Sequence, residues 1–190
     1  MTSWIKEKRK MKIFDKNFKE IFSAQLFSIA GGLIAGIVLA VYMDKIFIVP
    51  GMLIIIPGFM AMRGNISGAL ASRVTVGLLL GLVKPKKKGK IVKGNLSASL
   101  ILAGIVSLLL GIIAFTFNYL VLGILVPKII LIPLLAGIIS TFLLDHITLS
   151  ATTYIFGKGH DPNNIMGPLI TTAGDMTSII SLLIVILILI

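Results

Sequence analysis

The segment GPLITTAGDMTSIISLLIVILILI, from Gly167 to Ile190, decides the fold class of this chain. A helix needs roughly 20 mainly apolar residues to cross the hydrocarbon core of a bilayer, and this segment is long and apolar enough to do so. Its one ionisable side chain is Asp175. An ionised carboxylate near the bilayer centre costs about 2.5–3.5 kcal/mol on insertion scales, and such residues usually mark ion or proton pathways. The segment therefore predicts a spanning helix with a functional carboxylate.

The whole chain shares this composition. Of its 190 residues, 57% are hydrophobic and 13% are charged, whereas about a quarter of the residues in a soluble domain are charged. These values predict an all-α membrane protein. The absence of cysteine excludes disulfides, thiolate metal sites and cysteine nucleophiles. The sequence also has no HExxH motif and no phosphate-binding glycine loop, so it does not indicate an enzyme.

Five spanning helices are predicted, at residues 24–43, 46–83, 96–117, 121–144 and 165–189. The second segment would reach about 57 Å as one helix, against a hydrocarbon core of about 30 Å. The segment is interrupted at Pro50–Gly51, at Pro57–Gly58 and at residues 62–65, and Gly64 is a candidate position for a break within the helix. A polar connection is expected at residues 150–164, between the fourth and fifth helices.

The first 23 residues form a separate predicted unit, 1–23, ahead of a five-helix membrane unit at 24–190. Lysine and arginine alternate there with apolar side chains such as Met11, Phe14 and Phe18, which fall on one helical face. This pattern favours a basic amphipathic helix lying on the membrane surface. A solvated basic tail that only fixes the topology is an equal alternative.

Basic residues gather in two tracts, with seven of the 18 lysines and arginines in residues 1–20 and six in residues 84–93. Both tracts flank apolar segments, as expected for cytoplasmic helix ends that contact anionic lipid headgroups. This placement argues against a nucleic-acid partner. It predicts a multi-pass protein of the cell membrane with a cytoplasmic N-terminus and an external C-terminus.

Oxygen-bearing side chains surround the predicted intramembrane carboxylate. Thr171 and Thr172 precede Asp175 by four and three residues, so all three share one helical face. Hard divalent cations prefer oxygen ligands, and Mg²⁺ usually keeps several waters while touching one or two carboxylates. The alternative is a structural Asp175, protonated or paired with Arg63 or Arg73.

Two further side chains are weaker candidates for the same metal site. Asn65 offers a side-chain oxygen beside the expected break in the second helix, although helix packing explains it equally well. Asp145 is predicted at the inner end of the fourth helix, where a solvated helix end is the favoured interpretation.

Three stretches carry a family resemblance. DPNNIMGPLITTAGDMTSI (161–179), PGFMAMRGNISGALASRV (57–74) and LLDHI (143–147) resemble conserved segments of MgtE-type divalent cation transporters. The resemblance is to a single pore unit, and we expect no counterpart of that family's cytoplasmic regulatory domains.

The resemblance implies a pore at a homodimer interface, lined by the second and fifth helices. Asp175 would hold hydrated Mg²⁺, with the Thr171 carbonyl as helper and Asn65 lining the same path. The expected function is a channel or transporter for Mg²⁺, with Mn²⁺ and other divalent cations as further candidates. A proton- or sodium-coupled exchanger and a non-transporting membrane scaffold remain the alternatives.

Overall fold

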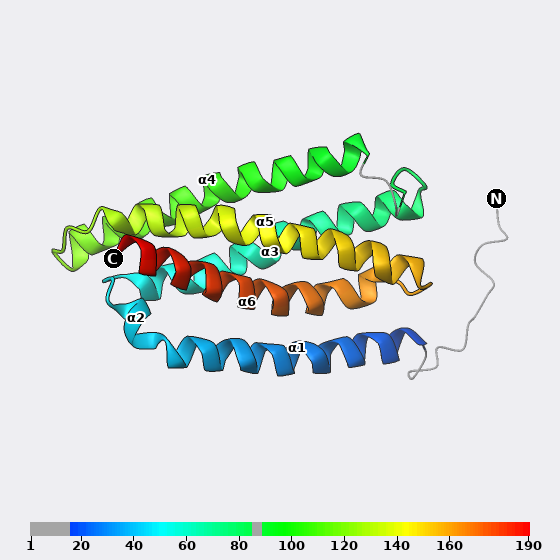
Figure 1. Cartoon of the computed structure of the whole chain (residues 1–190), viewed down its shortest axis with the longest axis horizontal. Coiled ribbons are helices and arrows are strands. Elements are labelled where there is room, and N and C mark those ends of the chain that lie inside the picture. The colour runs from blue at the N-terminus through cyan, green and yellow to red at the C-terminus, as the bar shows by residue number, and fades with distance from the viewer. Residues whose placement is uncertain (1–15, 85–88) are drawn as a thin grey trace, which may run out of the picture.

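The computed structural model describes residues 16–84 and 89–190. Within these ranges the chain forms six α-helices (Figure 1): α1 (Lys16–Val41), α2 (Met43–Phe47), α3 (Met52–Leu79), α4 (Lys90–Val121), α5 (Lys128–Gly157) and α6 (Pro162–Leu189). Five of these described helices, all except α2, are long and apolar enough to cross a membrane. The predicted all-α fold with five helices able to cross a membrane is therefore confirmed.

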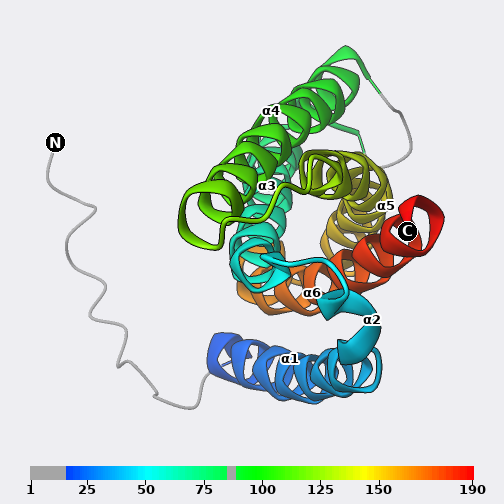
Figure 2. The same cartoon turned by 90° about the vertical axis from the view of Figure 1, so that its left-hand side faces the viewer.

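The long helices form one bundle in which α3, α5 and α6 are central (Figure 2). α1 packs against α6 at one edge, whereas α4 packs against α3 and α5 at the other. In the most apolar part of each helix, 17% of α1 and 22% of α4 are buried, against 44–50% of the central three. The two edge helices therefore leave most of their apolar surface for lipid.

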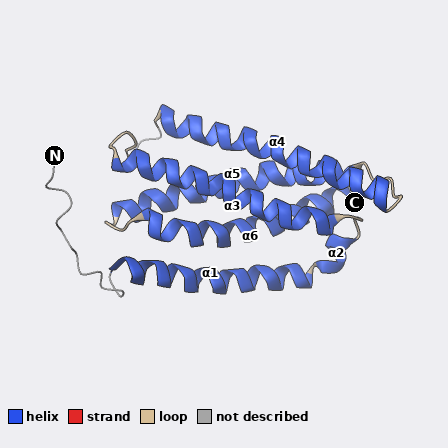
Figure 3. Cartoon of the chain, turned by 180° about the vertical axis from the view of Figure 1, so that it is seen from behind, coloured by secondary structure: helices blue, strands red, loops and turns tan. Residues whose placement is uncertain are grey.

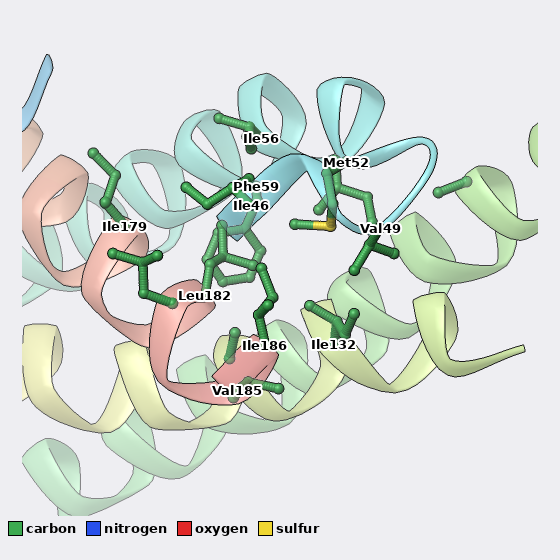
Figure 4. Close-up of a cluster of buried hydrophobic side chains, with 14 of the residues drawn as sticks. Ile46, Val49, Met52, Ile56, Phe59, Ile132, Ile179, Leu182, Val185 and Ile186 are labelled. Atoms are coloured by element: carbon green, nitrogen blue, oxygen red, sulfur yellow. The ribbon is translucent and has the colours of Figure 1, made fainter. Parts of the chain in front are cut away.

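The bundle has two chemically different ends, which Figures 1 and 3 show from opposite sides. One end gathers the starts of α1, α4 and α6 with the ends of α3 and α5, and we call it the basic end. Its described lysines are Lys16, Lys19, Lys84, Lys90, Lys93 and Lys158. Near the other end α2 packs between α1 and the central helices, and side chains such as Ile46, Phe59, Ile132 and Ile186 form the main apolar core (Figure 4).

The predicted boundaries of the fourth helix are wrong at both ends. α5 begins at Lys128 and continues to Gly157, so most of the expected 150–164 connection is helical. The hydroxyls of Thr152 and Thr153 donate to the carbonyls of Thr148 and Leu149, at 2.7 and 2.9 Å. Polar side chains that bond back to their own helix in this way let it continue where the composition suggests an end.

The second predicted span is also corrected, because α3 runs without a break from Met52 to Leu79 and passes through Gly64. Of the three expected interruptions, the one at Pro50–Gly51 is present, and Gly51 there has a positive φ of 84°. A Cβ at this position would overlap Asn118 Oδ1. The Asn118 side chain from α4 donates to the Pro50 carbonyl at 2.6 Å and fixes the turn.

The remaining helices are longer than predicted. α1 is continuous from Lys16, so residues 16–23 are the start of the first spanning helix. The rest of the predicted N-terminal helix lies outside the described residues. α6 starts at Pro162, where the Asp161 carboxylate accepts from the Asn163 N–H at 2.9 Å and caps the helix.

Candidate functional site

The candidate site begins where α3 and α6 approach each other closely. A Cβ built on Gly174 would lie 3.9 Å from the backbone nitrogen of Gly64. A side chain at Gly174 would be in ordinary van der Waals contact with α3 at this distance, so the two helices pack directly against each other here. Asn65 and Asp175 directly follow the two glycines, so the contact brings together the parts of α3 and α6 that carry these two predicted site residues.

Asp175 lies about 20 Å along α6 from Pro162 at 1.5 Å per residue, close to the middle of the helix. The residue is partly exposed. No hydrogen bond or ion pair joins its carboxylate to any residue in the described ranges 16–84 and 89–190. An intramembrane carboxylate without a donor or counter-ion is available to a ligand.

Two of the other predicted residues lie on the same outer surface. Thr171 is exposed one turn before Asp175, and its hydroxyl donates to the Gly167 carbonyl at 3.1 Å. Asn65 is exposed on α3. We call the surface formed by Asn65, Thr171 and Asp175, together with the small exposed residues Ala61 and Ala69, the α3–α6 face.

A cavity of about 140 Å³ lies between the last turns of α3 and the first turns of α6, at the basic end. Its lining includes the hydroxyl residues Ser72 and Thr75 and the amide residue Asn163. Gly68 and Gly167 also line it, so it adjoins the α3–α6 face. Hydroxyl and amide residues therefore line a cavity between the α3–α6 face and the basic end.

Thr172 belongs to a different contact. Its hydroxyl donates to Ser28 Oγ of α1 at 2.9 Å, and a Cβ at Gly31 would overlap its methyl group. The side chain therefore joins α6 to α1, while its neighbour Thr171 is exposed. The structure does not bring Thr172 to the surface on which Asn65 and Asp175 lie.

Asp145 is also separate from the α3–α6 face. It lies about 18 Å along α5 from Gly157 and is 2% exposed, so the predicted solvated helix end is wrong. Its Oδ1 accepts from Ser67 Oγ of α3 at 2.8 Å, and its Oδ2 accepts from Ser99 Oγ of α4. The carboxylate is enclosed by three helices.

The buried partners of Asp145 were not identified as a group from the sequence. Arg63 is fully buried, and its Nη1 donates to Thr141 Oγ1 of α5. A guanidinium contact with Asp175, which the scaffold alternative requires, is absent from the described residues, and Arg73 is exposed. The available signal was the four-residue spacing of Arg63 and Ser67 on one helix and of Thr141 and Asp145 on the other, which places each pair on one helical face.

The described residues contain no group of three or more His, Cys, Asp or Glu side chains that could hold a metal ion. At the basic end, Glu20 of α1 contacts His160 at 2.8 Å and Asn164 at 3.0 Å. These contacts join the start of α1 to the start of α6, so Glu20 lies away from the α3–α6 face. Within one copy of the chain, Asp175 is the single carboxylate on that face.

A bundle of spanning helices with an unpartnered intramembrane carboxylate is typical of membrane proteins that move ions. The family model described as MgtE, divalent cation transporter, matches residues 56–185, which is more than half of the chain. The chain belongs to this family of divalent cation transporters. No curated protein and no solved structure matched the chain.

Proposed function

We propose that this chain forms a homodimeric channel or transporter that moves hydrated Mg²⁺ along the α3–α6 face. The observation that carries the proposal is the carboxylate of Asp175, which lies near the middle of a helix long enough to cross a membrane and has no donor or counter-ion in the described chain. A cation supplied from solution would offset the cost of keeping this charge away from bulk water.

A second copy of the chain would complete the site. Mg²⁺ commonly keeps several waters and is held by one or two carboxylates, and one copy supplies a single carboxylate on this face. Cyclic two-fold dimers are the commonest oligomers. Packing two α3–α6 faces around a two-fold axis would bring two copies of Asp175 to one ion.

Other groups on the same face would contact the waters that the ion keeps. The Thr171 backbone carbonyl and the Asn65 side-chain oxygen would accept hydrogen bonds from the waters that the ion keeps. The small neighbours Ala61 and Ala69 would leave space for those waters. Thr172 and Asp145 are outside the proposed path, because their polar atoms are engaged with Ser28 and with Ser67 and Ser99.

The lysines of the basic end support a cytoplasmic position for that end and therefore for the N-terminus. The opposite end of the described chain carries Lys45 and Lys128. With this orientation in a cell membrane, an interior-negative potential of 100 mV would drive a doubly charged ion inward by about 4.6 kcal/mol.

The test is Mg²⁺ uptake into liposomes containing the full chain. Asp175→Asn keeps the size of the side chain and removes its charge, so we expect uptake to fall at least about tenfold. Asp44→Asn removes an exposed carboxylate from α2 and is the matched control, with uptake unchanged. Unchanged uptake by a folded Asp175→Asn variant would contradict the proposal.

The same liposomes separate the alternative mechanisms. Uptake that follows the membrane potential alone favours a channel or uniporter. Uptake that requires an opposing H⁺ or Na⁺ gradient would replace the proposal with a coupled exchanger. Competition by Mn²⁺ or Ca²⁺ measures which divalent cations the site accepts.

A further inference from the structure

The interior of the bundle holds a second charged region, which we call the Arg63–Asp145 cluster. It consists of Arg63 and Ser67 on α3, Ser99 on α4, and Thr141 and Asp145 on α5. Four of the five residues are at most 2% exposed, and Ser99 is 7% exposed. The cluster takes no part in the proposed ion path, so its role needs a separate explanation.

The cluster joins α3 to α5 at two successive levels. Arg63 donates to Thr141, and one turn further along both helices Ser67 donates to Asp145 at 2.8 Å. The residues of both pairs are 78 positions apart in the chain. Since α3 and α5 run in the same direction, two bonds with this common offset fix both the rotation of α3 and its position along α5.

The two charges of the cluster depend on each other. Arg63 has no contact with solvent, and its Nε and Nη2 atoms have no hydrogen-bond partner in the described chain. Arg63 and Asp145 do not form a direct ion pair, but Asp145 lies close enough to attract the guanidinium. Removing either group would leave the other as an uncompensated buried charge.

The rotation of α3 about its axis determines which of its side chains lie on the α3–α6 face. Successive residues of an α-helix are about 100° apart around its axis. Asn65 follows Arg63 by two residues and therefore points roughly 200° away from it, to the outer surface. Between them, Gly64 makes the close approach to Gly174. Inward anchoring of Arg63 thus directs Asn65 outward beside Asp175.

We propose that Arg63 and Asp145 are positioning residues that hold α3 in the rotation that places Asn65 on the ion path. They act through the helix and do not touch the ion. A cation site at Asp145 is disfavoured, because both carboxylate oxygens already accept hydrogen bonds and a guanidinium lies nearby. This inference rests on the proposed function only in taking the α3–α6 face as the ion path.

The first readout is the exposure of position 65 to water. The chain has no cysteine, so Asn65→Cys provides one thiol whose labelling rate by a water-soluble methanethiosulfonate can be measured in membranes. We expect Asp145→Asn or Arg63→Gln to slow this labelling at least about fivefold. The double variant Arg63→Gln with Asp145→Asn leaves no unpaired charge, and its labelling should return to within about twofold of the parent rate.

The second readout is Mg²⁺ uptake in chains that retain Asn65. Each single variant should lose at least about tenfold in rate, the double variant should recover most of it, and Asp44→Asn should behave like the parent. The positioning role would be overturned if Arg63→Gln and Asp145→Asn left the labelling rate at position 65 unchanged. It would also be overturned if the double variant took up Mg²⁺ as slowly as the single variants. Unchanged uptake in Asp175→Asn would instead overturn the ion path, and the labelling result would stand.

A milder variant covers the case in which a single variant does not reach the membrane. Ser67→Ala keeps both charges and removes one of the two bonds between α3 and α5. We expect labelling at position 65 and uptake both to fall about threefold. Normal values for both measurements would reject the proposal.

Discussion

Asp145 and Asp175 are carboxylates at similar depths in neighbouring spanning helices, and their surroundings are opposite. Asp145 is 2% exposed and accepts hydrogen bonds from two serines, with Arg63 nearby. Asp175 is partly exposed and has no partner among the residues that the structure describes. Both carboxylates lie within spanning helices, yet only one is compensated by the protein itself.

This difference separates two uses of an intramembrane charge. A carboxylate supplied with donors and a counter-ion contributes to holding helices in register, because its cost is offset inside the bundle. A carboxylate without them is costly in the isolated unit and favours binding of a cation. Surroundings, and not residue type, therefore distinguish the structural acid from the candidate ion ligand.

The largest expected difference between the two acids is in the free energy of unfolding that each contributes. Asp145→Ala leaves the Arg63 charge buried and unpaired, which should cost about 3–5 kcal/mol of unfolding free energy. Asp175→Ala removes an uncompensated charge and should change it by less than about 1 kcal/mol. Denaturation in detergent micelles, followed by circular dichroism, measures both. Equal losses in the two variants would contradict the proposed distinction.

Stabilisation of the folded chain by Mg²⁺ should depend on Asp175. At a free concentration one hundred times the dissociation constant, a ligand stabilises the folded protein by about 2.7 kcal/mol. We expect the parent chain and Asp44→Asn to show this increase in thermal shift assays, and Asp175→Asn to lose it. An equal shift in Asp175→Asn would place the bound ion elsewhere.

The smallest predicted effect compares the adjacent residues Thr171 and Thr172. Thr172→Val removes the hydrogen bond to Ser28, and such bonds between membrane helices contribute about 0.6 kcal/mol on average. Thr171→Val removes only an exposed bond within its own helix and should leave stability unchanged within measurement error. A larger loss for Thr171→Val would show that the two side chains are wrongly assigned to the two faces of α6.

Much of the fold could be predicted from the sequence, because runs of apolar residues identify spanning helices without knowledge of their neighbours. The last helix was predicted to within a few residues of its observed ends. The boundary of α5 was missed because Thr152 and Thr153 bond to their own helix. The site was predicted less completely, since Thr171 and Thr172 both lie about one turn before Asp175 but contact different surroundings.

The sequence by itself determined the class of protein and the positions of its costly charges, since both follow from composition and spacing along single helices. Only the tertiary structure decided which charge is compensated, because Ser67 and Ser99 donate to Asp145 from other helices and Arg63 lies nearby. The same packing left Asp175 without a partner in the described chain. Hydrogen bonds and charge interactions act over a few ångströms, and distances between helices are set by the packing of the whole bundle.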